Sequence, residues 1–162
     1  MNNLGLTCIS EELKDKDKKK YSFQTMTRKR FNDLCVRDGK NEAIEELSQR
    51  ILHNVRVTRY IIRHCISNNI LHYRLSSALF PLVTDEKTEV TLNDLPDKVL
   101  IQEELEFAGK IAKDFGISIG SHPDQYIPCA GPTFPPVGIR PASTPSWTLR
   151  CTSPYSQFST PA

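Results

Sequence analysis

The sequence predicts an α/β fold with a parallel sheet, and three observations lead to this prediction. Three short apolar segments, "LGLTCIS", "ILHYRLSS" and "ISIGS", have the length and composition of strands. Long amphipathic helical patterns separate them, and this alternation is typical of parallel βαβ units. A polar loop follows each strand. The order fits either an open sheet or part of a (β/α)8 barrel.

The first predicted strand, residues 4–10, is an almost continuous apolar run, which predicts burial on both faces of a parallel sheet. Residues 11–20 are almost all Lys, Asp and Glu, so we expect a solvated loop or a short helix there. Thr27 is a suitable N-cap for the next helix, because apolar residues recur with a helical period over residues 31–35.

The longest helical pattern covers residues 41–67, where apolar residues recur every three or four positions and form one stripe. Asn68 and Asn69 end it, because Asn tolerates the left-handed backbone conformation. After the second strand, we expect residues 76–96 to form a polar loop. A second long helix follows that loop and ends at Gly116.

The loops after the three predicted strands carry the polar and charged side chains that are candidates for a functional site. They read "ISEELKDK", "SSALFPLVTDE" and "HPDQY". In open sheets and in barrels alike, functional residues gather at the carboxyl ends of parallel strands. We therefore expect these three loops to line one site.

Composition excludes several classes of protein. The chain has 162 residues, enough for one domain with a real core, and its net charge of +2 does not by itself indicate nucleic acid. No apolar run is long enough for a membrane span, and the first residues do not resemble a signal peptide. The five cysteines are odd in number and lack CxxC spacing, so we expect reduced thiols in a cytoplasmic protein, with Cys8 and Cys65 buried.

Residues 129–162 differ in character from the rest of the chain. They hold seven of the eleven prolines and only two charged residues, Arg140 and Arg150. Proline at this density prevents helices and central strands, so we expect a disordered tail after a folded part that covers residues 1–128. A shifted reading frame explains this composition equally well.

The loop after the third strand holds three candidate site residues. A histidine at its start, His122, suits a metal ligand or an acid-base group, and its alternative is a hydrogen-bonded structural role. Gln125 and Tyr126 place an amide beside an aromatic ring, a pair that can bond to and stack on an unstacked base. The alternative for Tyr126 is an ordinary half-buried position.

Two further groups of charged residues are candidates. Asp85 and Glu86 are adjacent carboxylates that suit a hard divalent cation, although such pairs are also common as solvated loop residues. Arg28, Lys29 and Arg30 lack local acidic partners and would attract a phosphate backbone. Their alternative is a solvated helix start.

The segments "LGLTCIS", "TMTRKRF", "YRLSSALFPLVT" and "SHPDQY", in this order and at these intervals, resemble the UV damage endonuclease family over residues 4–128. The resemblance implies a DNA-repair nuclease on a TIM barrel that acts on UV-damaged double-stranded DNA. Such an enzyme nicks the strand 5′ of UV photoproducts and uses a cluster of divalent metals, with Mn²⁺ expected.

By resemblance, His122 matches a metal-binding histidine of the family, Gln125 the amide that probes the lesion, and Tyr126 the aromatic wedge. Asp85 stands where the family usually has a histidine ligand, which replaces a nitrogen ligand with an oxygen and changes the metal preference. Ser10 stands where the family has an asparagine beside the lesion. With Arg74 of the "YRxSS" motif and the three basic residues at positions 28–30, Ser10 completes our candidate DNA contacts.

The remaining metal ligands and the catalytic groups of the family lie on later strands, and nothing after Pro128 matches them. We therefore expect the first three β/α units of a metal-dependent endonuclease, inactive or impaired alone, with one open apolar sheet face. The alternative is a non-catalytic module that binds damaged DNA. A third hypothesis is a sugar isomerase of similar architecture, which the "HPDQY" and "YRLSS" segments disfavour.

Overall fold

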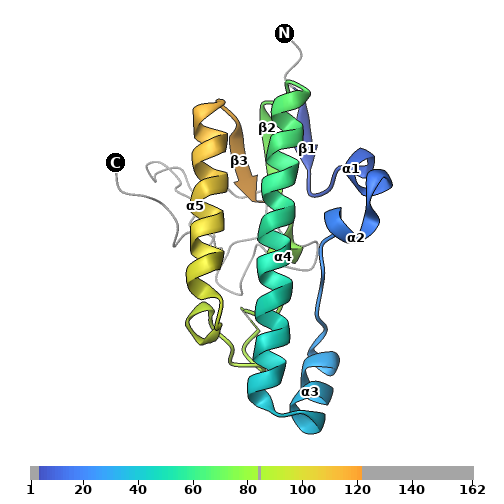
Figure 1. Cartoon of the computed structure of the whole chain (residues 1–162), viewed down its shortest axis with the longest axis vertical. Helices are drawn as coiled ribbons and strands as arrows, with labels where there is room; N and C mark the ends of the chain where they lie inside the picture. The colour runs from blue at the N-terminus through green and yellow to red at the C-terminus, as the bar shows by residue number, and fades with distance from the viewer. Residues whose placement is uncertain (1–3, 84, 122–162) are drawn as a thin grey trace, which may run out of the picture. The chain divides into compact units, whose positions relative to one another are not determined.

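The computed structural model describes residues 4–83 and 85–121, and within them three strands form one parallel sheet (Figure 1). The strands are β1 (Gly5–Thr7), β2 (His72–Leu75) and β3 (Ser118–Ser121), in the order β1-β2-β3. Leu6 pairs with Tyr73, and Tyr73 pairs with Ile119. The predicted parallel α/β order is confirmed, and three such strands are compatible with an open sheet and with part of a barrel.

Five α-helices and two short 3-10 helices complete the described part of the chain. The helices are α1 (Glu11–Lys16), α2 (Lys18–Tyr21), α3 (Arg28–Arg37), α4 (Lys40–Ser67) and α5 (Lys98–Asp114), with η1 (Ser77–Leu79) and η2 (Leu92–Asp94) between β2 and α5. The predicted tail, residues 129–162, lies outside the described residues.

Local sequence signals placed the helix ends correctly. The Thr27 hydroxyl accepts a hydrogen bond from the Arg30 amide at 3.3 Å and caps α3, as predicted. Asn69 (φ 55°) and Gly116 (φ 68°) have left-handed backbones just after α4 and α5. These conformations end the helices, because Asn and Gly adopt them at lower cost than other residues.

α4 and α5 cover one face of the sheet, and the hydrophobic core lies between these helices and the sheet (Figure 1). The core cluster contains Val57, Ile61, Ile62, Cys65, Tyr73, Ala108, Ala112 and Ile117. Burial raises the pKa of the Cys65 thiol to about 11, so this cysteine is inert packing material, as the sequence predicted. Helix α4 has 28 residues and is therefore about 42 Å long. It extends past the carboxyl ends of the strands to α3.

The opposite face of the sheet corrects two predictions. Its side-chain positions are Gly5, Thr7, His72, Arg74, Ser118 and Gly120, and all six are exposed. β1 is therefore not buried on both faces. The open face is also small and polar, not apolar as expected, because side chains alternate along each strand and Tyr73 takes the inner position of β2.

The connection between β2 and α5 also differs from the prediction of a polar loop. Leu79, Phe80, Val90 and Leu95 are all buried within it. These four side chains anchor the connection in the interior. The sequence contained this signal, but without a regular period the apolar residues did not predict a structure.

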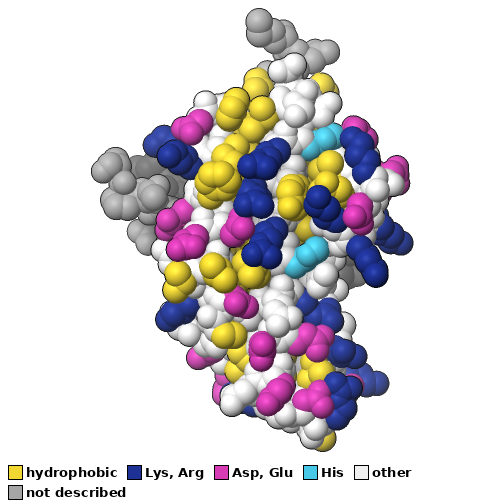
Figure 2. Space-filling model, viewed as in Figure 1, with side chains coloured by type: hydrophobic (Ala, Val, Ile, Leu, Met, Phe, Trp, Pro, Cys, Tyr) yellow, Lys and Arg dark blue, Asp and Glu magenta, His cyan; other side chains and the backbone are white. Residues whose placement is uncertain are grey.

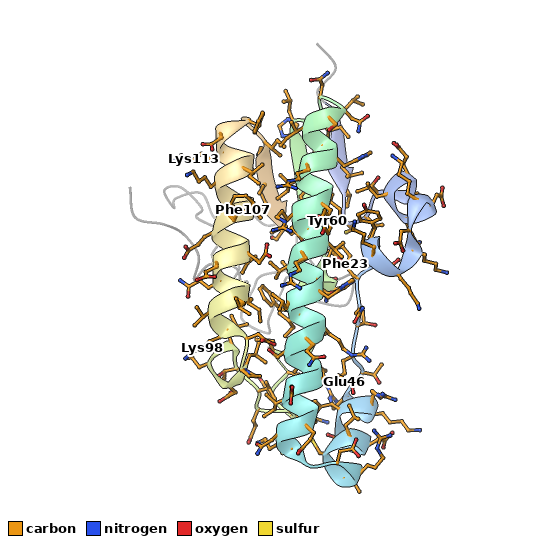
Figure 3. The ribbon with its side chains drawn as sticks, viewed as in Figure 1. Phe23, Glu46, Tyr60, Lys98, Phe107 and Lys113 are labelled. Carbon is orange, nitrogen blue, oxygen red and sulfur yellow. The ribbon has the colours of Figure 1, made fainter. Side chains whose placement is uncertain are left out.

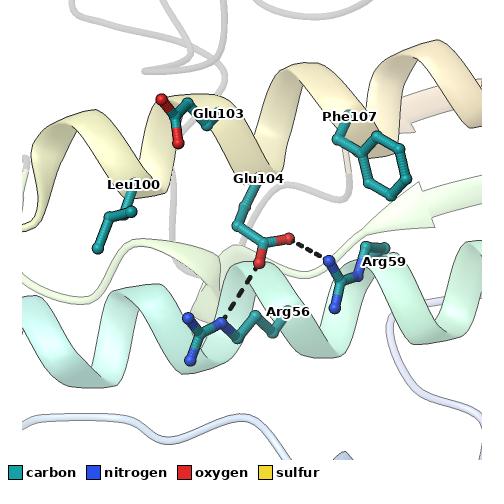
Figure 4. Close-up of a pocket in the computed structure, with 6 residues that line it drawn as sticks. All are labelled: Arg56, Arg59, Leu100, Glu103, Glu104 and Phe107. Carbon is teal, nitrogen blue, oxygen red and sulfur yellow. Dashed lines mark hydrogen bonds and ion pairs between the residues drawn. The ribbon is translucent and has the colours of Figure 1, made fainter.

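An ion-pair cluster joins the two long helices on the surface (Figure 4). Glu104 of α5 accepts from Arg59 Nη1 at 2.6 Å and from Arg56 Nε at 3.4 Å. With Leu100 and Phe107, these residues line a pocket of about 160 Å³. Arg56 and Arg59 thus have a structural role, because they join α4 to α5.

Within the described ranges, no helix combines the length and the apolar character that a membrane crossing requires.

Candidate functional site

The carboxyl ends of β1 and β2 meet at one edge of the sheet, as predicted. Cys8 follows β1 with a left-handed backbone (φ 61°), and its amide donates to the Arg74 carbonyl at 2.9 Å. The Tyr73 hydroxyl donates to the Cys8 carbonyl at 3.1 Å. Cys8 is half-buried, not buried as predicted. Its partial burial raises the pKa of the thiol, and a hydrogen bond with Ser76 partly offsets this. The loops after these two strands therefore start side by side.

Two of the predicted DNA contacts lie near this edge. Ser10 is buried, and its hydroxyl caps α1 by accepting from the Leu13 amide at 3.4 Å. Arg74 is exposed on the open face of the sheet. The Ser10 hydroxyl already has a structural task, whereas the Arg74 guanidinium faces solvent.

An extended segment, residues 22–27, runs along α4 from α2 to α3, and we call it the strap. Three side chains of α4 hold its backbone. His53 Nε2 lies 3.0 Å from the Ser22 carbonyl, and Arg50 Nη1 donates to the Thr25 carbonyl at 2.6 Å. Figure 3 shows Phe23 of the strap beside α4, and Phe23 packs against the core. The strap therefore fixes where α3 begins.

Asn54 is the third of these side chains, and sequence reasoning missed it. It is fully buried. Its Oδ1 accepts from the Gln24 amide at 2.7 Å, and its Nδ2 donates to the Gln24 carbonyl at 2.9 Å. It also donates to the Ala78 carbonyl at 2.9 Å. Asn54 thus connects the strap to the loop after β2. The only signal in the sequence was one amide among the apolar residues of the α4 stripe.

Arg28 and Asp85, both predicted site residues, form an ion pair. Arg28 Nη2 and Nε donate to Asp85 Oδ2 at 2.6 Å and 2.9 Å. This contact lowers the pKa of Asp85. It joins the start of α3 to the loop after β2, which are 57 residues apart in the sequence. The pair therefore brings together two candidates that the sequence had assigned to different roles.

The other two basic residues of this group have different surroundings. Arg30 lies 3.5 Å from Glu46 of α4, and Glu46 also accepts from Arg50 at 2.6 Å. Lys29 is exposed and has no ion pair with any residue that the structure describes. Lys29 is therefore the cation of this group that is available to a phosphate.

The described residues do not fit a metal cluster. Within the described ranges, no three His, Cys, Asp or Glu side chains are placed to hold an ion. Both oxygens of Asp85 are in use, since Oδ1 accepts from the Lys87 amide at 2.9 Å. The predicted residues His122, Gln125 and Tyr126 lie outside the described residues.

A groove of about 440 Å³ lies on the helix-covered side, between α1, α2 and α4. Tyr21 and Tyr60 meet there edge to face at 5.4 Å, and Lys20 lies over both rings. Figure 2 shows basic side chains along the middle of this face. Arg63 of α4 lines this groove, and Arg56 and Arg59 line the pocket between α4 and α5. These cations lie on the helix-covered side, whereas Arg74 lies on the open face of the sheet.

Comparison with known proteins agrees with the resemblance seen in the sequence. A family model described as UV-endonuclease UvdE matches residues 2–134. The chain belongs to the UvdE family. It is 34% identical over 124 residues to a UV DNA damage endonuclease of Nostoc sp. and 29% identical over 123 residues to one of Halalkalibacterium halodurans. A protein of the same name from Deinococcus radiodurans is 27% identical over 127 residues.

These UvdE relatives are longer than the chain. Each alignment covers 76% of this chain but only 34–36% of the relative. The chain therefore spans about a third of the length of the curated relatives it matches. No solved structure matches it.

Proposed function

We propose that this chain is part of a DNA-repair endonuclease that hydrolyses a phosphodiester bond 5′ of UV photoproducts. The observation that carries this proposal is the family match over residues 2–134. Three relatives named UV DNA damage endonuclease support it. In the proposal, the three-stranded sheet is part of a (β/α)8 barrel whose carboxyl edge faces DNA.

The residues of this chain bind and recognise the damaged strand. The basic start of α3 and Arg74 attract the phosphate backbone, and Lys29 makes the most direct contact because it has no ion pair within the described part. Gln125 and Tyr126 fill the gap that a displaced nucleotide leaves in the duplex. Ser10 supports this surface by holding α1.

Hydrolysis by the complete site is expected to need divalent metal, with Mn²⁺ the candidate that the resemblance implies. The proposal assigns His122 a role as ligand, but the described donor set does not form a cluster. The catalytic groups are therefore placed outside the described residues. For the same reason, this chain alone is expected to cleave DNA poorly or not at all.

A strand-nicking experiment tests the function. The purified chain is mixed with UV-irradiated or unirradiated supercoiled plasmid, with Mn²⁺ or with a chelator, beside one of the longer relatives. Nicking of irradiated plasmid by the relative and weak or absent nicking by the chain is the expected result. Strong, chelator-resistant nicking of both plasmids by the chain would contradict the proposal.

The second candidate function is a non-catalytic module that binds damaged DNA. The Arg28–Asp85 ion pair favours this second candidate, because Arg28 occupies a carboxylate that a metal ion would need. Binding of His122→Ala to irradiated DNA separates the two candidates. A binding module keeps its full affinity without His122 and in the presence of chelator, whereas the nuclease site loses its metal-dependent binding.

A further inference from the structure

Asp85 occupies the position at which the family resemblance implies a metal ligand, but both of its carboxylate oxygens already accept hydrogen bonds from within the chain. Oδ2 accepts two hydrogen bonds from the Arg28 guanidinium, and Oδ1 accepts one from the Lys87 amide. The Asp85 side chain is only 16% exposed. A metal ion at Oδ2 would have to displace the guanidinium, and one at Oδ1 would lie beside a carboxylate whose negative charge the guanidinium already balances.

The turn around Asp85 is built to aim this side chain. The buried Thr88 hydroxyl bonds to the carbonyls of Leu82 and Asp85 at 3.1 Å and 3.0 Å. The Asp85 amide donates to the Leu82 carbonyl at 3.1 Å. Leu82 and Glu89 both have left-handed backbones, with φ of 63° and 52°. A turn that contains two unfavourable conformations is held by its surroundings, and the pair with Arg28 is part of them.

Arg28 is equally well fixed from the other side. It is the first residue of α3, directly after the Thr27 cap, and the strap before it is tied to α4 by Arg50, His53 and Asn54. Most surface ion pairs contribute little because two mobile side chains must be ordered. Here hydrogen bonds already fix the backbone at Arg28 and at Asp85, which reduces the entropic cost of ordering the two side chains.

We propose that Asp85 is a positioning residue that clasps Arg28 and thereby holds the basic start of α3 against the loop after β2. Asp85 is not a metal ligand in this chain. The clasp keeps Lys29 exposed at the carboxyl side of the sheet, where the proposed DNA contacts lie. This role does not depend on whether the chain cleaves DNA, so its test and the nicking test fail independently.

Four variants of the full chain test the clasp: Arg28→Gln, Asp85→Asn, the two combined, and Arg28→Asp with Asp85→Arg. Each single change is expected to lower Tm by about 2–4 °C, as loss of one well-placed pair would in a domain of this size. The double Gln/Asn variant is expected to melt no lower than the singles, because they remove the same interaction. The charge-swapped variant is expected to recover part of the loss.

Arg37→Gln is the matched control. It removes an arginine–aspartate pair between adjacent residues, Arg37 and Asp38, that connects no separate segments. Its Tm is expected to stay within about 1 °C of the wild type. Additive losses in the Gln/Asn double variant, or an equal loss in the control, would overturn the clasp.

Mn²⁺ binding, followed by the paramagnetic resonance of free Mn²⁺, separates a clasp from a ligand. With a clasp, the Mn²⁺ affinity of Asp85→Asn and of Arg28→Gln stays within about twofold of the wild type. If none of the three proteins binds Mn²⁺, the melting and exchange measurements decide. With a ligand, Asp85→Asn weakens binding tenfold or more and Arg28→Gln strengthens it, which would overturn the proposal.

Amide hydrogen exchange keeps the test decisive if melting is not cooperative. The Lys87 amide is bonded to Asp85, and the Thr88 amide donates to the Asp85 carbonyl. Faster exchange at both amides in Arg28→Gln supports the clasp, because the variant does not touch these groups directly. Unchanged exchange there would contradict it.

Discussion

The two ends of α4 differ in what they hold. Its carboxyl-terminal half carries Val57, Ile61, Ile62 and Cys65 against the sheet, and burial of apolar surface stabilises this end. Its amino-terminal part, up to Asn54, lies beyond the sheet (Figures 1 and 3). This part also buries Leu47 and Ile51, but in addition it holds the strap through the polar side chains of Arg50, His53 and Asn54. One helix therefore combines a non-directional core with a directional anchor, and the anchor is the part that arranges the candidate site.

Truncation in the apolar half should have the largest effect. Ile61 is 1% exposed, so Ile61→Ala leaves a cavity and is expected to lower the free energy of unfolding by about 2–4 kcal/mol. Urea unfolding followed by circular dichroism measures this loss. Val36→Ala, at a side chain that is 90% exposed, is the control and should change stability by less than about 0.5 kcal/mol. Equal effects of the two variants would mean that the described core does not form.

In the part of α4 that holds the strap, Asn54→Leu should have the next largest effect. It leaves the Gln24 backbone groups and the Ala78 carbonyl without their partner, at an expected cost of about 2 kcal/mol. Hydrogen exchange should accelerate in residues 22–28 and 77–79 but not in β2. Thr58→Val is the matched control, since its hydroxyl bonds only to the Asn54 carbonyl within α4. A uniform acceleration across the chain would mean that the two halves of α4 are not distinct.

Removal of a single phosphate contact should have a smaller effect. Lys29→Ala is expected to weaken binding to duplex DNA about fourfold near 0.1 M salt and to reduce the slope of log K against log salt by about 1. Lys113→Ala, near the sheet end of α5 (Figure 3), is the control and should leave the slope unchanged. If Lys113→Ala reduces the slope and Lys29→Ala does not, DNA binds at the other end of the molecule.

The smallest expected effect is electrostatic. The hydrogen bond from Arg50 lowers the pKa of Glu46 below its ordinary 4.5, so the charged form is favoured in the folded state. This contribution is present above pH 4.5 and disappears as the pH falls through the lowered value. Glu46→Gln should therefore cost about 0.5 kcal/mol at pH 7 and less near pH 3, by urea unfolding at each pH. A constant difference at both pH values would rule out the charge as its cause.

The sequence predicted what local chemistry determines. The Thr27 cap, the apolar stripe of α4 and the stops at Asn69 and Gly116 are signals within a few residues, and all four are confirmed. The parallel order followed from the alternation of strands and helices. The polar open face could have been predicted from "HYRL", in which exposed and inward residues alternate.

The candidate site was harder to predict from the sequence, because contacts between distant segments define it. Arg28 and Asp85 are 57 residues apart, and no local pattern connects them. Asn54 looked like an interruption of a stripe, since its partners are backbone atoms of distant segments. The roles of His122, Gln125 and Tyr126 came from resemblance and stay predictions.

The length of α4 makes it a lever. Over about 42 Å, a tilt of 5° at the sheet would move the far end by about 4 Å, which is more than the length of a hydrogen bond. The strap and the Arg28–Asp85 clasp restrict this tilt, because they tie the far end of α4 to α3 and to the loop after β2. Packing errors at the sheet are therefore expected to have their largest effect at α3, where the proposed contact of Lys29 with a phosphate depends on the angle of α4.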